Sequence, residues 1–181
     1  MKISAVKTRI LLPPQDNLLK VIRVSLKKIH EKSVLVITSK VISIWQGRCL
    51  PKKSFPHKDE LIIREADKYL ERKYTPGNHL IHTIKNNLLI SSAGIDESNA
   101  NGYYILWPKD TYTAAKKIHE FLKKTYKIKN CGVIISDSHS IPLRRGVMGI
   151  ALSYHGFDPL RDYRGEKDIF GRKLRSTQAN I

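Results

Sequence analysis

Cysteine is scarce in this chain, and the scarcity argues against two classes of small protein. Only Cys49 and Cys131 occur in 181 residues, and they show no CxxC spacing. A disulfide framework or a structural zinc site therefore has no basis in the sequence, and a reducing cytoplasm is the expected location. No HExxH motif occurs among the seven histidines, which are expected to be structural or exposed.

Long hydrophobic runs and glycine-rich phosphate loops are also missing. No apolar run approaches the roughly 20 residues that a membrane span needs, so no membrane partner is expected. The N-terminus lacks the apolar region of a signal peptide. Neither a P-loop nor a GxGxxG motif occurs. With 41% hydrophobic residues, the chain can nevertheless bury a core, which argues against disorder.

Acidic residues are few, at 16 against 33 lysines and arginines, and the net charge is +17. The excess is +9 in residues 1–60 and +7 in residues 121–181, whereas residues 61–120 carry only +1. Such a charge favours anionic partners, namely nucleotides, polyanionic metabolites or nucleic acid. Nucleic acid ranks last, because no sheet pattern of interleaved aromatic and basic residues occurs. A basic, solubilising surface is the alternative for most of the scattered lysines.

Hydrophobic periodicity predicts an α+β fold, with mixed and antiparallel sheets flanked by helices in a single domain over residues 1–181. Helices are expected at about 16–29 after an Asp16 cap, at 59–72, and at 111–126 after a Thr111 cap. Strands are expected at 3–10, 34–37, 103–106, 133–135 and 147–154, and a hairpin at 80–84 with 88–92. Residues after Gly156 are expected to form a long loop, and residues 176–181 the first turn of a helix.

Two acidic residues follow predicted strands in turns made of small residues. Asp96 stands in SSAGIDESN, and Asp137 stands between Ser136 and Ser138. Two carboxylates delivered from two strand ends can hold a divalent metal over a phosphate, and the Ser138 hydroxyl could add a ligand. Each acid alone fits a plain turn well, so the prediction of a Mg²⁺ or Mn²⁺ site depends on the pair.

Three further groups of residues could bind an anion or a nucleotide. Ser39 and Lys40 end a predicted strand, where hydroxyl, ammonium and backbone N–H groups could cradle a phosphate; a plain β-turn is the alternative. Asn99 suits a nucleobase or ribose contact, with an Asx-turn as the alternative. Arg144 and Arg145 could clamp a phosphate or carboxylate, although adjacent arginines point different ways and only one of them need act.

Taken together, these motifs resemble the coenzyme F420-0:L-glutamate ligase family. The matching segments are ITSKV at 37–41, AGID at 93–96 with Ser98 and Asn99, VIISDS at 133–138, RRG at 144–146 and DYRG at 162–165. The resemblance implies an α+β enzyme that uses GTP and Mn²⁺ or Mg²⁺ to join glutamate to a small carboxylate substrate such as coenzyme F420-0. It further implies an intertwined homodimer, metal ligation by Asp96, Asp137 and Ser138, and nucleotide contacts from Ser39, Lys40 and Asn99.

The chain ends where members of that family continue, so a short paralogue without the usual C-terminal segment is expected. Three functions follow from the sequence, in this order. The first is a ligase, the second a relative that binds a nucleotide or another polyanion without turnover, and the third a nucleic-acid binder. For the dimer, the candidate interface anchors are Trp107, Phe157 and Phe170, with burial in the monomer core as the alternative.

Overall fold

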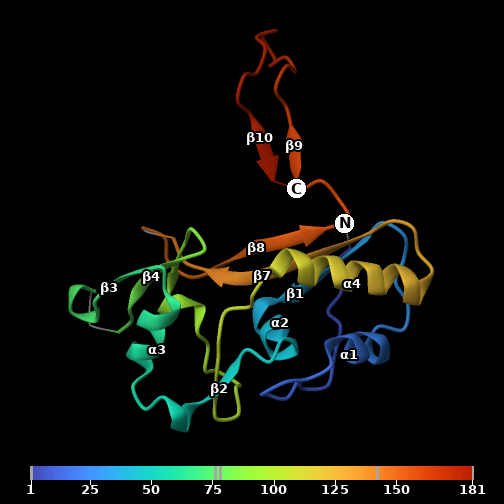
Figure 1. The fold of residues 1–181 in the computed structure, drawn as a ribbon. Coiled ribbons are helices and arrows are strands. Elements are labelled where there is room, and N and C mark those ends of the chain that lie inside the picture. Colours follow the sequence, from blue (N-terminus) through green and yellow to red (C-terminus); the bar gives the residue numbers. More distant parts are fainter. Residues whose placement is uncertain (1, 76, 78, 142, 181) are drawn as a thin grey trace.

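The computed structural model describes residues 2–75, 77, 79–141 and 143–180, with small sheets flanked by helices (Figure 1). The helices are α1 (Leu18–Ser25), α2 (Ser39–Trp45), α3 (Lys58–Glu65) and α4 (Thr111–Tyr126). The strands are β1 (Ser33–Thr38), β2 (Cys49–Pro51), β3 (Lys68–Leu70), β4 (His82–Lys85), β5 (Leu88–Ser91), β6 (Tyr103–Ile105), β7 (Cys131–His139), β8 (Met148–His155), β9 (Leu160–Asp162) and β10 (Gln178–Asn180). Three-residue 3₁₀ helices lie at Lys52–Ser54, Arg72–Tyr74 and Ser92–Gly94. The predicted α+β class is confirmed.

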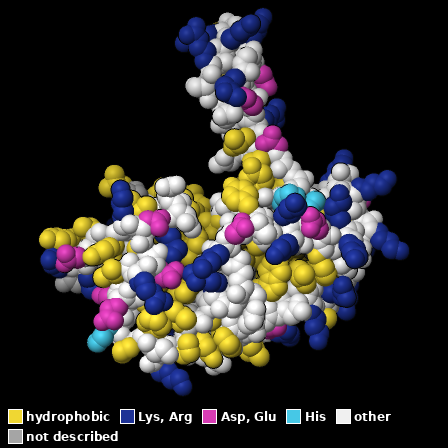
Figure 2. All heavy atoms as spheres, in the orientation of Figure 1, with side chains coloured by type: hydrophobic (Ala, Val, Ile, Leu, Met, Phe, Trp, Pro, Cys, Tyr) yellow, Lys and Arg dark blue, Asp and Glu magenta, His cyan; other side chains and the backbone are white. Residues whose placement is uncertain are grey.

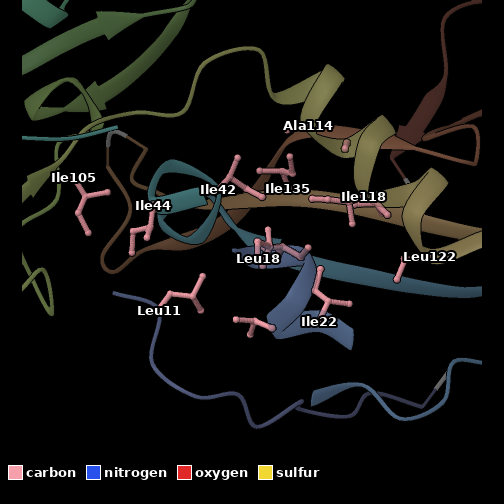
Figure 3. Close-up of a cluster of buried hydrophobic side chains, with 14 of the residues drawn as sticks. Leu11, Leu18, Ile22, Ile42, Ile44, Ile105, Ala114, Ile118, Leu122 and Ile135 are labelled. Carbon is pink, nitrogen blue, oxygen red and sulfur yellow. The ribbon is translucent and has the colours of Figure 1, made fainter. Parts of the chain in front are cut away.

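A mixed three-stranded sheet in the order β1–β7–β8 carries the larger hydrophobic core. β7 runs parallel to β1 and antiparallel to β8, and a bulge interrupts the β7–β8 register between Ile135 and Ser136. Val133 and Ile135 of β7 are fully buried, because their face of the sheet packs against the apolar stripe of α4. Ile118 and Leu122 of α4 lie in this core, close to Ile135 and the first two helices (Figure 3).

A second, smaller core lies beneath the antiparallel sheets. β3, β4 and β5 form one sheet, and β2 pairs with β6 to form another. One buried cluster joins α3, β6 and the segments next to the strands, and it comprises Leu61, Ile62, Ile81, Ala93, Ile95, Tyr104 and Leu106. The turn that carries Asp96 runs between these two cores, so both of them fix its position.

Residues 158–180, here called the arm, project from the body as a two-stranded hairpin (Figure 1). All six residues of β9 and β10 are exposed, and a backbone hydrogen bond from the Tyr163 N–H to the Thr177 carbonyl extends the ladder beyond them. At its far end lie many Lys and Arg side chains (Figure 2), and Ile169 and Phe170 are 92% and 89% exposed. The arm therefore keeps its shape with little apolar burial of its own.

Elements with strong local signals match their predictions. The 80–84/88–92 hairpin forms as β4 and β5, and the 103–106 strand forms as β6. The helix at 111–126 is α4, although its N-cap is Asp110, whose carboxylate accepts from the Thr113 N–H at 3.0 Å, and not Thr111. The strands at 34–37, 133–135 and 147–154 form as β1, β7 and β8.

Other predictions about the elements are wrong. Residues 3–10 form no strand and are exposed throughout, because no neighbouring strand pairs with them. Asp16 does not cap α1: Asn17 does, while the Asp16 carboxylate pairs with Arg9. The helix expected at 59–72 ends at Glu65, since residues 68–70 pair with β4. The tail at 178–180 is a strand paired with β9, not the start of a helix.

The two cysteines are not joined to one another. Cys49 and Cys131 are both buried free thiols, and burial raises the pKa of each. Within the described ranges, no helix has the length and hydrophobicity required to cross a bilayer.

Candidate functional site

A cavity of about 760 Å³ opens beside the end of β1 and is the candidate site. It collects most of the residues that sequence reasoning selected, because β1, the second half of β7 and the turn after β5 meet there. Its lining includes Ser39, Lys40, Asp96, Asp137 and Ser138. The structure thus brings together, in one cavity, the three predicted metal ligands and two of the three predicted nucleotide contacts.

Lys40 and Asp96 form the best-defined contact in the cavity. Lys40 is the second residue of α2, which begins directly where β1 ends, and its Nζ lies 2.6 Å from Asp96 Oδ2. The same ammonium donates to the backbone carbonyl and the hydroxyl of Ser98, at 3.0 Å each. Burial opposes ionisation of Asp96, but hydrogen bonds from Lys40 and Ser98 lower the pKa of this carboxyl overall. Asp96 is therefore an anion with its counter-charge already in contact.

The turn that presents Asp96 has a fixed conformation. Gly94 has a φ of +70°, and a Cβ at this position would lie 2.0 Å from the Trp107 ring, so only glycine fits. After the turn, the backbone of Asp96 exchanges two hydrogen bonds with Ile105, at 2.9 and 2.8 Å. Trp107 itself is 4% exposed, so its ring fills the monomer core, in agreement with the alternative to an interface anchor.

Asp137 lies inside β7, just past the bulge, and not in a turn after the strand as predicted. Burial raises the pKa of Asp137, and the charge of Asp96 raises it further. Hydrogen bonds from the Ser138 N–H, at 2.7 Å, and from Ser39 oppose that rise only in part. Two carboxyl groups thus influence one another in this cavity, while the single ammonium of Lys40 contacts Asp96.

These residues fit a hard divalent cation in their chemistry. Asp96, Asp137 and Ser138 supply oxygen atoms, which Mg²⁺ and Mn²⁺ prefer, and an added cation would favour the ionised form of Asp137 against the burial and the Asp96 charge that raise its pKa. In the part of the chain that is described, no three His, Cys, Asp or Glu side chains are grouped to hold an ion. A metal here would depend on two carboxylates plus hydroxyl, water or substrate oxygens, and it would compete with Lys40 for Asp96.

Asn99, Arg144 and Arg145 lie outside the cavity lining. Asn99 is exposed with a φ of +54°, a conformation typical of turns. Both arginines are exposed, and Arg144 contacts Met148 Sδ at 3.9 Å. The structure therefore does not bring these three residues to the carboxylates.

Sequence reasoning missed two kinds of residue in the cavity. Ser43 is fully buried and lines it, and its Oγ has no hydrogen-bond partner among the described residues. Buried hydroxyls without a partner are uncommon, so Ser43 is an unsatisfied polar group beside the cavity. Lys58 and Glu97 also line the cavity, but a lysine in a charged helix and a glutamate in a turn carry no motif that would have marked them.

The geometry defines a class of binding site: acidic oxygens and ammonium groups around a cavity large enough for a nucleotide-sized ligand. The model of the F420-0:gamma-glutamyl ligase family matches residues 6–181, and the chain belongs to this family.

Two curated relatives named coenzyme F420:L-glutamate ligase show how far the similarity extends. The protein from Methanopyrus kandleri is 30% identical over 91% of this chain and 70% of its own length. The one from Methanocaldococcus jannaschii is 31% identical over 84% of this chain and 66% of its own length. The similarity thus spans about two thirds of each relative and nearly all of this chain.

Proposed function

We propose that this protein is an amide-forming ligase that joins L-glutamate to a small carboxylate substrate such as coenzyme F420-0, with GTP as co-substrate. One observation carries the proposal: in a chain of the F420-0:gamma-glutamyl ligase family, Lys40, Asp96 and Asp137 converge on one cavity. In the proposed reaction, the γ-phosphoryl group of GTP passes to the substrate carboxylate and GDP leaves. The amine of glutamate then attacks the acyl carbon, phosphate departs, and the nitrogen loses a proton as the amide forms.

Asp96, Asp137 and Ser138 are the proposed holders of Mg²⁺ or Mn²⁺. When bound, the cation supplies charge neutralisation for the phosphate oxygens. The chain's own contribution is to hold the two carboxylates: Asp96 through the Gly94–Trp107 contact, and Asp137 through its place in the central strand β7. Fixed oxygens on rigid elements need no reorganisation during the reaction.

Ser39, Lys40 and Ser43 are the residues we propose for the phosphates of the nucleotide. A lysine ammonium that leaves Asp96 for a phosphate oxygen gains a stronger, doubly charged partner. The buried Ser43 hydroxyl supplies a donor with no competing protein acceptor in the described residues. Asn99, Arg144 and Arg145 are not part of this proposed machinery, because they lie outside the lining.

Binding of a nucleotide or another polyanion without turnover is the second candidate. The Lys40–Asp96 pair favours it, because the ammonium already occupies the carboxylate that a metal needs. If the pair persists when a ligand binds, Lys40 can still hold a phosphate. Asp96 would then not be available to a metal, which would have Asp137 as its one carboxylate ligand of the two.

We also propose that the functional unit is a homodimer, supported by the arm. Ile169 and Phe170 expose large apolar side chains at its far end, away from the body. Phe157, the second proposed anchor, is half-buried within the chain and contacts Tyr154 at 5.7 Å between ring centroids. Phe170 is therefore the stronger anchor of the two.

The deciding experiment incubates the purified protein with coenzyme F420-0, L-glutamate, GTP and Mn²⁺. Mass spectrometry is expected to show the glutamylated product in amounts equal to the GDP released. Asp137→Asn is expected to lower the amount of product at least about a hundredfold, whereas Glu120→Gln, a matched change at an exposed acid of α4 outside the cavity lining, should leave turnover unchanged. Metal-dependent GTP binding without any product would select the second candidate.

A further inference from the structure

Two lysines share one glutamate beside the candidate site. Lys52 Nζ and Lys58 Nζ each donate to a different carboxylate oxygen of Glu97, both at 2.9 Å. Both ammonium groups also lie near the ring of Tyr104, at 5.5 and 5.9 Å from its centroid. Tyr104 is buried in β6, so its ring is held in place next to the two ammonium groups.

The charges of this cluster do not balance. Two ammonium groups face one carboxylate, and their hydrogen bonds lower the pKa of Glu97, which keeps it ionised. One lysine would suffice to neutralise Glu97 and to tie its turn to the helix α3. The second lysine adds a positive charge that the first repels, and each ammonium has three donors, of which Glu97 takes one. The cluster therefore carries one net positive charge that a single added carboxylate would neutralise.

The position of the cluster connects it to the chemistry of the cavity. Lys58 and Glu97 line the same cavity as Asp96 and Asp137, and Glu97 is the residue next to Asp96 in the chain. Adjacent residues of one turn thus contact the two groups, Asp96 through Lys40 and Glu97 through Lys52 and Lys58. A small molecule in the cavity would meet the carboxylates of Asp96 and Asp137 and the ammonium group of Lys58, while Lys52 is bonded to Glu97 from outside the lining.

We propose that Lys58 in the cavity lining, reinforced by the charge of Lys52 on their shared Glu97, binds a carboxylate of the amino acid that is added, and so selects an acidic amino acid. This inference rests on the proposed function, because it assigns the recognition of the same reaction's second substrate. Glu97 sets the spacing of the two ammonium groups, and the Tyr104 ring holds them in place. A carboxylate that joins them completes a cluster of two positive and two negative charges, whereas the neutral amide of glutamine leaves the extra positive charge in place.

The test measures amino-acid binding apart from catalysis. Calorimetry on the full chain, with Mn²⁺ and a non-hydrolysable GTP analogue present, compares L-glutamate, L-glutamine and the α-amide of L-glutamate. The wild type is expected to bind glutamate at least about tenfold more tightly than one of the two amides. Weak binding of glutamine would show that the γ-carboxylate is recognised, and weak binding of the α-amide would show that the α-carboxylate is. Equal affinity for all three ligands would overturn the inference.

Variants then assign the recognition to the lysines. Lys58→Met and Lys52→Met are each expected to weaken glutamate binding about tenfold and to reduce the preference over the amide, with nucleotide affinity unchanged. Lys53→Met, an exposed neighbour, is the control for general charge loss. Two lysine variants are used so that a folding defect in one, seen as a lower Tm, leaves the other informative. Glutamate affinity like that of the wild type in both would refute the assignment.

Outcomes for this inference and for the proposed function are separable. If glutamate binds with the expected preference but no glutamylated product forms, the lysine pair stands and the ligase proposal fails. If product forms while Lys52→Met and Lys58→Met leave the apparent KM for glutamate unchanged, the ligase stands and the lysine pair fails.

Discussion

The strand β7 and the arm hold their apolar side chains in opposite ways. In β7, Val133 and Ile135 are fully buried, because the strand is paired on both sides and α4 covers one face. In the arm, Ile169 and Phe170 are almost fully exposed, although they are just as hydrophobic. Burial in this protein therefore follows from the partners that the fold supplies, and the arm is ordered chiefly by its own backbone bonds and side-chain pairs such as Arg164–Asp162.

The largest expected effect is the loss of stability when a buried side chain of β7 is removed. Ile135→Ala removes a fully buried side chain and should lower the free energy of unfolding by about 2–5 kcal/mol, because a cavity remains among well-packed neighbours. Denaturant titration followed by circular dichroism measures it. Ile169→Ala in the arm, the matched control, should change stability by less than about 0.5 kcal/mol. Similar losses in both variants would show that the arm is packed in solution.

The comparison also shows which elements a sequence can predict. α4 and the β4–β5 hairpin were predicted because their apolar spacing and turn residues act within a few positions of the chain. The strand expected at 3–10 has the right alternation but no partner, and alternation alone forms no ladder. The tail at 176–181 has a helix-start sequence, yet residues 178–180 pair with β9, a contact that only the fold specifies.

The candidate site was predictable to a similar degree. Asp96, Asp137 and Lys40 were found because each stands at the end of an apolar run that predicts a strand, although Asp137 in fact lies inside β7. Lys58, Glu97 and Ser43 were missed, since their role depends on the packing of α3, the turn and α2 around the cavity. Arg144 and Arg145 were selected for their residue type and for the RRG motif, and neither determines where the loop places the two side chains.

The joint between the body and the arm is expected to be sensitive to acid. His119 of α4 contacts His155 of β8, with ring centroids 4.8 Å apart, immediately before Gly156. Burial, together with the nearby charges of His155 and Lys123, lowers the pKa of His119 below its usual value of 6.5. The unfolded chain therefore binds a proton more readily, so stability is full above about pH 6.5 and is lost as the pH falls toward the folded pKa.

This acid sensitivity can be measured by thermal denaturation between pH 7.5 and 5.5. The wild type should lose about 1–3 °C in Tm over this range through His119. His119→Gln should flatten that decline, whereas His30→Gln, a change at an exposed histidine, should not. An equal decline in wild type and His119→Gln would place the sensitivity elsewhere.

An effect of similar size concerns the carboxylate within β7. Because burial raises the pKa of Asp137, its charged form destabilises the folded state at neutral pH, above the folded pKa. Asp137→Asn keeps an oxygen that can accept from the Ser138 N–H and removes the charge, so Tm at pH 7 should rise by about 1–3 °C. Differential scanning calorimetry without added metal measures it. The rise should vanish near pH 3, where the wild-type carboxyl is protonated; a lower Tm at pH 7 would contradict this account of Asp137.

The smallest expected change in stability accompanies a change in assembly. Phe170→Asp places a charge at the far end of the arm and should leave Tm within about 1 °C, because the side chain is 89% exposed in the chain. If the arm joins two copies, light scattering at micromolar concentration should show a shift from twice 20.8 kDa toward 20.8 kDa. A wild type that is already a monomer would remove the dimer proposal.

The contact between Gly94 and Trp107 has an optical consequence. The chain contains two tryptophans: Trp107 lies against the turn that presents Asp96, and Trp45 ends the helix that begins at Ser39 and Lys40. Movement of either element when a ligand enters the cavity changes the surroundings of an indole ring. The intrinsic fluorescence of the unlabelled protein can thus report ligand binding. Trp45→Phe and Trp107→Phe separate the two signals, so that the response of each element to metal and to nucleotide can be measured on its own.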